Sequence, residues 1–257
     1  MLLAIDVGNT NLVFAIVDQQ QIRHQWRIST NDRRTADEYG VWLSELLGLE
    51  NVDQNEIDGV IISSVVPATN RALEDLCQKY LKQTPLWVGD MKTKLGIDIL
   101  VHNPSEVGAD RLVNVVAAYE KYQKAAIILD FGTATTLDVM SDEGAYLGGI
   151  ICPGINLSLK ALYDASAKLP MISIEEPKHK TIIGKSTVEA MSSGIYWGYI
   201  AMIEGLVQRL KAEHGEMPVI ATGGLSSVIA KKANIINHVE PELTVLGLKA
   251  IWQMNKS

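Results

Sequence analysis

One strand-turn-strand pattern occurs twice in this chain, 124 residues apart. The first copy reads LLAIDVGNTNLVFAIVD (residues 2–18), an apolar run that is interrupted by an aspartate, a glycine and small polar residues and then resumes. The second copy reads AAIILDFGTATTLDVMSD (residues 125–142). The matching pairs are Asp6 and Asp130, Gly8 and Gly132, and Asp18 and Asp142. A repeat at nearly half the chain length predicts two related halves.

Each copy is followed by alternating helix and strand patterns. Helical spacing of apolar residues predicts helices over 35–49, 70–81, 111–122, 155–169 and 187–211. Short apolar runs predict strands over 21–28, 59–67, 84–89 and 218–224, and a closing strand and helix over 243–254. This alternation is typical of an α/β fold. We therefore expect a duplicated α/β architecture with halves 1–115 and 116–257.

Composition excludes several classes of protein. The chain has 257 residues, 47% of them apolar, which is enough for a large core. The net charge of -7 is spread without a basic block, so we expect no nucleic-acid partner. Two cysteines in apolar surroundings and five scattered histidines predict neither disulfides nor a zinc site. With no export signal and no transmembrane helix expected, a cytoplasmic protein is predicted.

The repeated turn has two interpretations. Asp-x-Gly between apolar strands is first of all a hairpin, because glycine tolerates positive φ and aspartate accepts hydrogen bonds from nearby N–H groups. Two matched copies also permit a nucleotide site, in which N–H groups and Thr or Asn side chains bind a polyphosphate from opposite sides. The carboxylates at the strand ends can then hold hydrated Mg²⁺ against phosphate oxygens. The repetition favours the nucleotide site.

Other phosphate-binding motifs are missing from the sequence. GKS at 184–186 resembles the end of a Walker motif, but its first glycine would fall at His179, and no GxGxxG occurs. PVIATGG (218–224) predicts a buried strand that runs into a glycine pair and then a helix, where a flat ring can approach the backbone. A tight connection between strand and helix explains the same residues equally well.

The three segments together resemble a known superfamily. DVGNTN, DFGTATT and ATGG are similar to the phosphate 1, phosphate 2 and adenosine motifs of actin, the Hsp70 ATPase domain and the acetate and sugar kinases. NPSEVGADRLVN (103–114), DFGTATTLDV (130–139) and GGIICPG with ASAKLP (148–170) resemble type III pantothenate kinases more closely. The resemblance implies a duplicated ribonuclease H-like fold, in which the two α/β halves surround a nucleotide.

The resemblance also implies the reaction, which is phosphorylation of the primary hydroxyl of pantothenate by ATP at the start of coenzyme A synthesis. It assigns the catalytic base to Asp110, which would accept the hydroxyl proton. The substrate contacts that it implies are Gly108, Ala109, Asp110, Arg111 and Thr187. Without the resemblance, Asp110 is also explained as an acid that stabilises a helix start, and Thr187 as an N-cap.

On the nucleotide side, the implied ATP contacts are Asp6, Val7, Gly8, Asn9, Thr10, Asn11, Leu12, Val13 and Thr133. Asp6 would hold Mg²⁺ through water. Asp130 stands where the family holds a monovalent cation, K⁺ or NH₄⁺, although the residues alone do not distinguish this from a second Mg²⁺ carboxylate. Val101 departs from the family, many members of which have Tyr there, and this puts one polar contact to pantothenate in doubt.

The resemblance further implies a homodimer, with ATP and pantothenate as the small-molecule partners. Two alternatives stay open at this point. One is a kinase of the same fold that acts on another small hydroxyl or carboxylate substrate. The other is a non-catalytic nucleotide-binding regulator, because a fold does not by itself establish chemistry.

Overall fold

The computed structural model describes residues 1–19, 21–166, 168–178 and 181–256, and the chain forms two compact units. The first unit is Met1–Tyr122 with Leu243–Ser257, and the second is Gln123–Glu242. The predicted boundary at residues 115 and 116 therefore falls inside helix α3 (Ala109–Tyr122), which the first unit keeps whole. Helix α7 (Leu243–Asn255) returns to the first unit because it packs closely on α3: a Cβ on Gly247 would lie 2.2 Å from the carbonyl oxygen of Val113.

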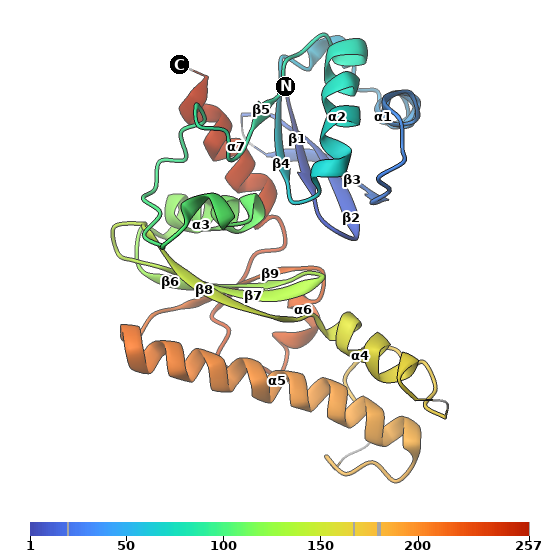
Figure 1. Cartoon of the computed structure of the whole chain (residues 1–257), viewed down its shortest axis with the longest axis vertical. Coiled ribbons are helices and arrows are strands. Elements are labelled where there is room, and N and C mark those ends of the chain that lie inside the picture. Colours follow the sequence, from blue (N-terminus) through green and yellow to red (C-terminus); the bar gives the residue numbers. More distant parts are fainter. Residues whose placement is uncertain (20, 167, 179–180, 257) are drawn as a thin grey trace. The chain divides into compact units, whose positions relative to one another are not determined.

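The first unit is a mixed sheet with helices on both faces (Figure 1). In the described residues its strand order is β3-β2-β1-β4-β5, where β1, β2 and β3 are antiparallel and β1, β4 and β5 are parallel. The strands are β1 (Leu2–Val7), β2 (Asn11–Val17), β3 (Ile22–Ser29), β4 (Gly59–Ser64) and β5 (Leu86–Trp87). The other helices are α1 (Ala36–Leu49) and α2 (Pro67–Leu76), a π-helical turn at Cys77–Leu81, and 3-10 turns at Gln54–Glu56 and Pro104–Glu106.

Strand alternation divides this sheet between two apolar clusters. Leu3, Ile5 and Val7 of β1 face a cluster that includes buried residues of α1 and α2. Leu2 and Ala4 face the other cluster, to which α3 and α7 contribute. Because side chains two positions apart share a face, Asp6 lies on the face of the sheet that α3 covers.

The second unit repeats this sheet. Its order in the described residues is β10-β9-β6-β7-β8, with β6, β7 and β8 antiparallel and β6, β9 and β10 parallel. The strands are β6 (Ala126–Phe131), β7 (Ala134–Met140), β8 (Tyr146–Pro153), β9 (Val219–Gly223) and β10 (His238–Val239). The helices are α4 (Ile155–Asp164), α5 (Thr187–His214) and the single turn α6 (Ser226–Ile229).

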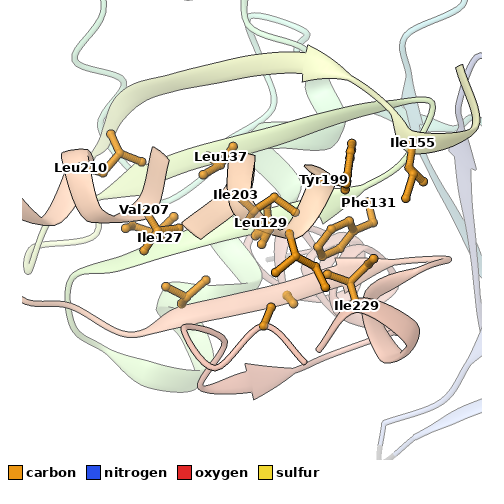
Figure 2. Close-up of a cluster of buried hydrophobic side chains, with 14 of the residues drawn as sticks. Ile127, Leu129, Phe131, Leu137, Ile155, Tyr199, Ile203, Val207, Leu210 and Ile229 are labelled. Atoms are coloured by element: carbon orange, nitrogen blue, oxygen red, sulfur yellow. The ribbon is translucent and has the colours of Figure 1, made fainter. Parts of the chain in front are cut away.

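One large apolar cluster holds the second unit together (Figure 2). Ile127, Leu129 and Phe131 project from one face of the sheet toward Ile203 and Val207 of the long helix α5. All five side chains are at most 4% exposed. Asp130 alternates with these residues along β6 and therefore lies on the opposite face.

The duplication extends to backbone details. β6 has the same length and the same burial pattern as β1, and so has β7 compared with β2. The pairing to the third strand is irregular at corresponding places, between Ile16 and Val17 in one unit and between Val139 and Met140 in the other. The predicted duplicated α/β fold is thus confirmed.

The two hairpin turns differ in length by one residue. Val7 pairs with Leu12, whereas Phe131 pairs with Thr135. The offset of 124 residues therefore holds for β1 and β6 but becomes 123 for β2 and β7. The proposed match of Asp142 with Asp18 is wrong, because the shorter turn places Ser141 directly after the second strand of the repeat.

Several element boundaries also differ from prediction. Pro67 begins α2 instead of ending a strand, as suits a residue without an N–H group. The helix expected from 155 to 169 ends at Asp164, and the helix expected after the glycine pair is only one turn long. The closing strand, β10, precedes the predicted range. Cys77 and Cys152 are free thiols.

Candidate active site

The first hairpin lies where the parallel strands β1 and β4 end. Asp6 and Ser63 are paired across these strands, and the N–H of Val65 donates to the carbonyl of Val7 at 3.0 Å. The turn is closed by the N–H of Gly8, which donates to the carbonyl of Asn11 at 3.0 Å. Polar ligands bind at this edge of an α/β sheet because strand carboxyl ends and helix N-termini meet there.

The predicted ATP stretch divides into exposed and buried residues. Asn9 and Thr10 at the tip are exposed, while Asp6 is half-buried. Val7 and Leu12 are at most 1% exposed and pack in the core of the first unit. Only the main chain of these two residues could serve a ligand.

The Gly-Ala-Asp-Arg segment begins α3 at the same edge of this sheet. A Cβ on Gly108 would lie 3.6 Å from Cγ1 of Val65, the residue that follows β4. Ala109 packs in the cluster that α3 and α7 share with Ala4 of β1. The structure therefore brings Asp110 and Asp6 to the same face and the same end of one sheet.

The carboxylate of Asp110 is closely enclosed. The N–H of Arg111 donates to Oδ1 of Asp110 at 2.8 Å, and a Cβ on Gly108 would lie 2.6 Å from the same oxygen. Burial raises the pKa of Asp110 above its ordinary value, and the hydrogen bond and charge of Arg111 oppose this only in part. A raised pKa makes a carboxylate a better proton acceptor, as a general base requires.

The second hairpin places Asp130 beside glycines. In β9, the strand next to β6, Gly223 has φ of +87°, and a Cβ there would lie 2.5 Å from Oδ1 of Asp130 and 2.7 Å from the backbone of Phe131. The first glycine of the ATGG segment therefore makes room for the carboxylate and its strand. Around a Cβ on Gly224 there is open space, so only the second glycine leaves its backbone accessible to a flat ring.

Gly154, the residue before α4, contacts the turn that carries Thr133. The N–H of Gly154 donates to the carbonyl of Thr133 at 3.1 Å. A Cβ on Gly154 would lie 2.2 Å from that carbonyl oxygen and 2.8 Å from the carbonyl oxygen of Gly132. The side chain of Thr133 stays exposed.

Thr187 is the first residue of α5, but it does not cap the helix. The cap is Ser186, whose hydroxyl accepts the N–H of Glu189 at 3.3 Å. In the described part of the second unit, no hydrogen bond joins Thr187 to the Asp130 hairpin. Its exposed hydroxyl is thus not needed for capping, and the interpretation of Thr187 as an N-cap is wrong.

A hollow of about 810 Å³ adjoins Gly108 and Ala109 in the first unit. Its walls come from the ends of β4 and β5, the start of α2 and the 3-10 turn at Pro104–Glu106. Glu74, Asp90 and Glu106 line it, whereas Arg111 does not. This acidic lining disfavours the carboxylate of an anionic substrate.

Two residues that hold the hairpins, Thr30 and Gly154, were missed by the sequence interpretation. They stand 124 residues apart, at the same offset as Asp6 and Asp130. Extending the repeat beyond the hairpins would have matched them. Among the described residues there is no cluster of three or more His, Cys, Asp or Glu that could hold a metal, and none of their helices is long and apolar enough to cross a membrane.

Comparison with known proteins identifies the family. A family model described as type III pantothenate kinase matches residues 2–209. The type III pantothenate kinase of Paramagnetospirillum magneticum is 52% identical over 258 positions, which cover 100% of this chain and 98% of that protein. This chain belongs to the type III pantothenate kinase family. The type III pantothenate kinase of Zymomonas mobilis is 53% identical, with 98% of this chain and 92% of that protein covered.

Solved structures confirm the ribonuclease H-like fold of this type III pantothenate kinase family member. An Arthrobacter polyphosphate/ATP-glucomannokinase aligns over 100% of this chain and 99% of its own, with a TM-score of 0.53 and 16% identity. The (R)-2-hydroxyglutaryl-CoA dehydratase component A of Acidaminococcus fermentans aligns over 100% and 99%, with a TM-score of 0.57 and 12% identity. At these identities the likeness concerns the fold alone.

Proposed function

We propose that this chain transfers the γ-phosphoryl group of ATP to the primary hydroxyl of pantothenate, with Asp110 as the base. The activity is that of the family to which the chain belongs, and it yields 4'-phosphopantothenate, the first step of coenzyme A biosynthesis. The observation that supports the role of Asp110 is its enclosed carboxylate with a raised pKa at the start of α3.

In the proposed reaction, Asp110 accepts the hydroxyl proton while the new oxygen–phosphorus bond forms. The bond between the γ-phosphorus and the bridging oxygen breaks, and ADP leaves with the electron pair. Because phosphoryl transfer needs mainly positioning and compensation of charge, one base is enough. Arg111, a permanent cation with planar donors, would bind the carboxylate of pantothenate, with Gly108, Ala109 and Thr187 as further contacts.

ATP is assigned to the residues Asp6, Val7, Gly8, Asn9, Thr10, Asn11, Leu12, Val13 and Thr133. Kinases of this family use ATP with a divalent metal, which neutralises phosphate charge when bound. The donor set at Asp6 fits Mg²⁺, which usually takes one or two carboxylates and completes its shell with water and phosphate oxygens. A dedicated cage of side chains is not required.

A monovalent cation, K⁺ or NH₄⁺, is assigned to Asp130. The neighbours of this residue in the sheet support the assignment, since Asp130 pairs with Thr136 on one side and with Thr222 on the other. Asp6 has Val13 and Ser63 in the corresponding places. Asp130 thus has more oxygen atoms on its face of the sheet, which suits a hard cation.

The assembly and location are also proposals. We expect a cytoplasmic homodimer, as the family resemblance implies. Exposed apolar side chains in the second unit support a partner surface; they include Leu157 and Leu162 of α4 and Val188 of α5. Sedimentation of the purified chain would test the dimer.

The transfer itself is tested by release of ADP from ATP with pantothenate, several sugars or acetate as acceptor, with Mg²⁺ and with or without K⁺. We expect ADP release with pantothenate only. Equal or faster release with a sugar would instead support the alternative of a kinase for another hydroxyl. ATP-analogue binding without turnover on any acceptor would support a regulator.

A further inference from the structure

Thr30 holds the first hairpin through two hydrogen bonds. Its N–H donates to the carbonyl of Thr10 at 2.9 Å, and its hydroxyl donates to the carbonyl of Gly8 at 2.6 Å. Thr30 is half-buried and follows the last residue of β3. One residue therefore holds the carbonyl groups on both sides of Asn9, the residue at the tip of the turn.

The directions of these carbonyl groups determine on which side of the turn the N–H groups lie. The described residues contain no cis peptide bond, and in a trans peptide the C=O and the following N–H point in opposite directions. With the carbonyls of Gly8 and Thr10 directed at Thr30, the N–H groups of Asn9 and Asn11 point to the other side of the turn. N–H groups that lie on the same side of a turn attract anions, while carbonyl oxygens repel them.

We propose that Thr30 is a positioning residue for ATP, whose hydroxyl keeps the carbonyl of Gly8 away from the phosphates. The inference rests on the proposed assignment of ATP to residues 6–13. It goes beyond that assignment because Thr30 lies outside residues 6–13 and would act through the carbonyl groups of the turn.

The second unit shows what happens where this hydroxyl is missing. Gly154 stands at the corresponding place, and its N–H makes the same backbone bond, to the carbonyl of Thr133. The carbonyl of Gly132, which corresponds to that of Gly8, would collide with a Cβ on Gly154. The shorter turn therefore leaves no room for a side chain there. The longer turn in the first unit leaves a gap that the hydroxyl of Thr30 bridges.

The experiment compares Thr30→Val, Thr30→Ser and Thr244→Val with the unmodified chain. Valine keeps the shape and the N–H of Thr30 but lacks the hydroxyl, and serine restores the hydroxyl. Thr244 is the matched control, because it is a half-buried threonine of the same unit whose hydroxyl donates to Oδ1 of Asn114 at 2.8 Å. The readouts are the Kd of a non-hydrolysable ATP analogue with Mg²⁺, the KM for pantothenate and the Tm.

We expect Thr30→Val to weaken analogue binding by about fivefold, the effect of one net hydrogen bond, with the KM for pantothenate unchanged. Thr30→Ser should restore most of the affinity, and Thr244→Val should lower only the Tm. An unchanged Kd in Thr30→Val, or the same loss of affinity in Thr244→Val, would overturn the inference. Because analogue binding needs no transfer, this failure differs from failure of the proposed reaction, which would appear as no ADP release with pantothenate by the unmodified chain.

Discussion

The two hairpins have strands of equal length, the same burial pattern and the same backbone hydrogen bond to the threonine of the turn. They differ in the residue that contacts the turn from the third strand's end. In the first unit the side chain of Thr30 reaches a carbonyl, whereas in the second unit Gly154 brings the backbone itself against the turn. The two copies of a duplicated fold can thus keep the same main-chain hydrogen bonds while different residues support their turns.

The carboxylates at the two hairpins also have different surroundings. Asp130 lies between Thr136 and Thr222 in the sheet, and the hydroxyl of Thr136 donates to Asp138 at 3.2 Å. Asp6 shares its face with Ala4 and other apolar residues that α3 covers. This difference supports the proposed assignment of the monovalent cation to Asp130 and not to Asp6.

The largest effect is expected at Asp110, the proposed base, which lies in the first unit and has no proposed counterpart in the second. Asp110→Asn keeps an oxygen that can accept the N–H of Arg111 but cannot take a proton. We expect turnover to fall by at least about 100-fold, with binding of an ATP analogue retained. Near-normal turnover would return Asp110 to the role of a helix-start acid.

The raised pKa of Asp110 also predicts how the stability of the folded protein depends on pH. Because burial raises its pKa, folding favours the protonated acid; this stability is present below the ordinary pKa of Asp and is lost as pH rises through the raised value. At neutral pH we therefore expect Asp110→Asn to melt no lower than the unmodified chain. The acid limb of turnover should lie above the ordinary pKa of aspartate, and a limb at or below that pKa would contradict burial of the base.

The next largest effect is expected at Gly154, whose backbone packs directly against the second turn. In Gly154→Ala the new Cβ meets two carbonyl oxygens that cannot turn away, so we expect a loss of about 3 kcal/mol in the free energy of unfolding. Gly198→Ala is the control, since its Cβ would meet open space on α5. Urea unfolding measures both, and equal stability of the two variants would show that the turn can move.

A smaller effect is expected at Asp130, and it distinguishes the proposed role of Asp130 from that of Asp6. Asp130→Asn should raise the K⁺ concentration for half-maximal turnover by about tenfold, the scale of losing one charged ligand interaction. Lowering the Mg²⁺ concentration should not increase the difference in K⁺ requirement between Asp130→Asn and the unmodified chain, because the divalent metal is assigned to Asp6. If K⁺ activates Asp130→Asn and the unmodified chain equally, the cation does not bind at Asp130.

The smallest effect is expected at Gly108, where the neighbouring atom is a carboxylate that can shift. Gly108→Ala would push Oδ1 of Asp110 away, and we expect turnover to fall by about tenfold or less with the fold intact. Gly48→Ala on α1 is the control, with open space around its Cβ. Equal turnover in these two variants would show that the position of Asp110 tolerates displacement.

The sequence predicted the elements that depend on local patterns. Apolar runs interrupted by a polar turn located β1, β2, β6 and β7, and the repeat paired Asp6 with Asp130. It did not show that the second turn is one residue shorter, because an offset of 124 also matches Asp18 with Asp142 and only strand pairing reveals the change. The offset of 124 also matches Thr30 with Gly154, but it does not show that these residues contact the turns, because those contacts depend on packing between segments about 20 residues apart.

The most direct test of the account is whether both turns bind the phosphates of one ATP. Calorimetric titration of a non-hydrolysable ATP analogue with Mg²⁺ would compare the unmodified chain with Thr10→Val and Thr133→Val. The account predicts that each variant weakens analogue binding by about tenfold or more, as expected for a hydrogen bond to a charged group, and leaves the KM for pantothenate unchanged. Unchanged affinity in either variant would contradict it, because one hairpin would then take no part in ATP binding.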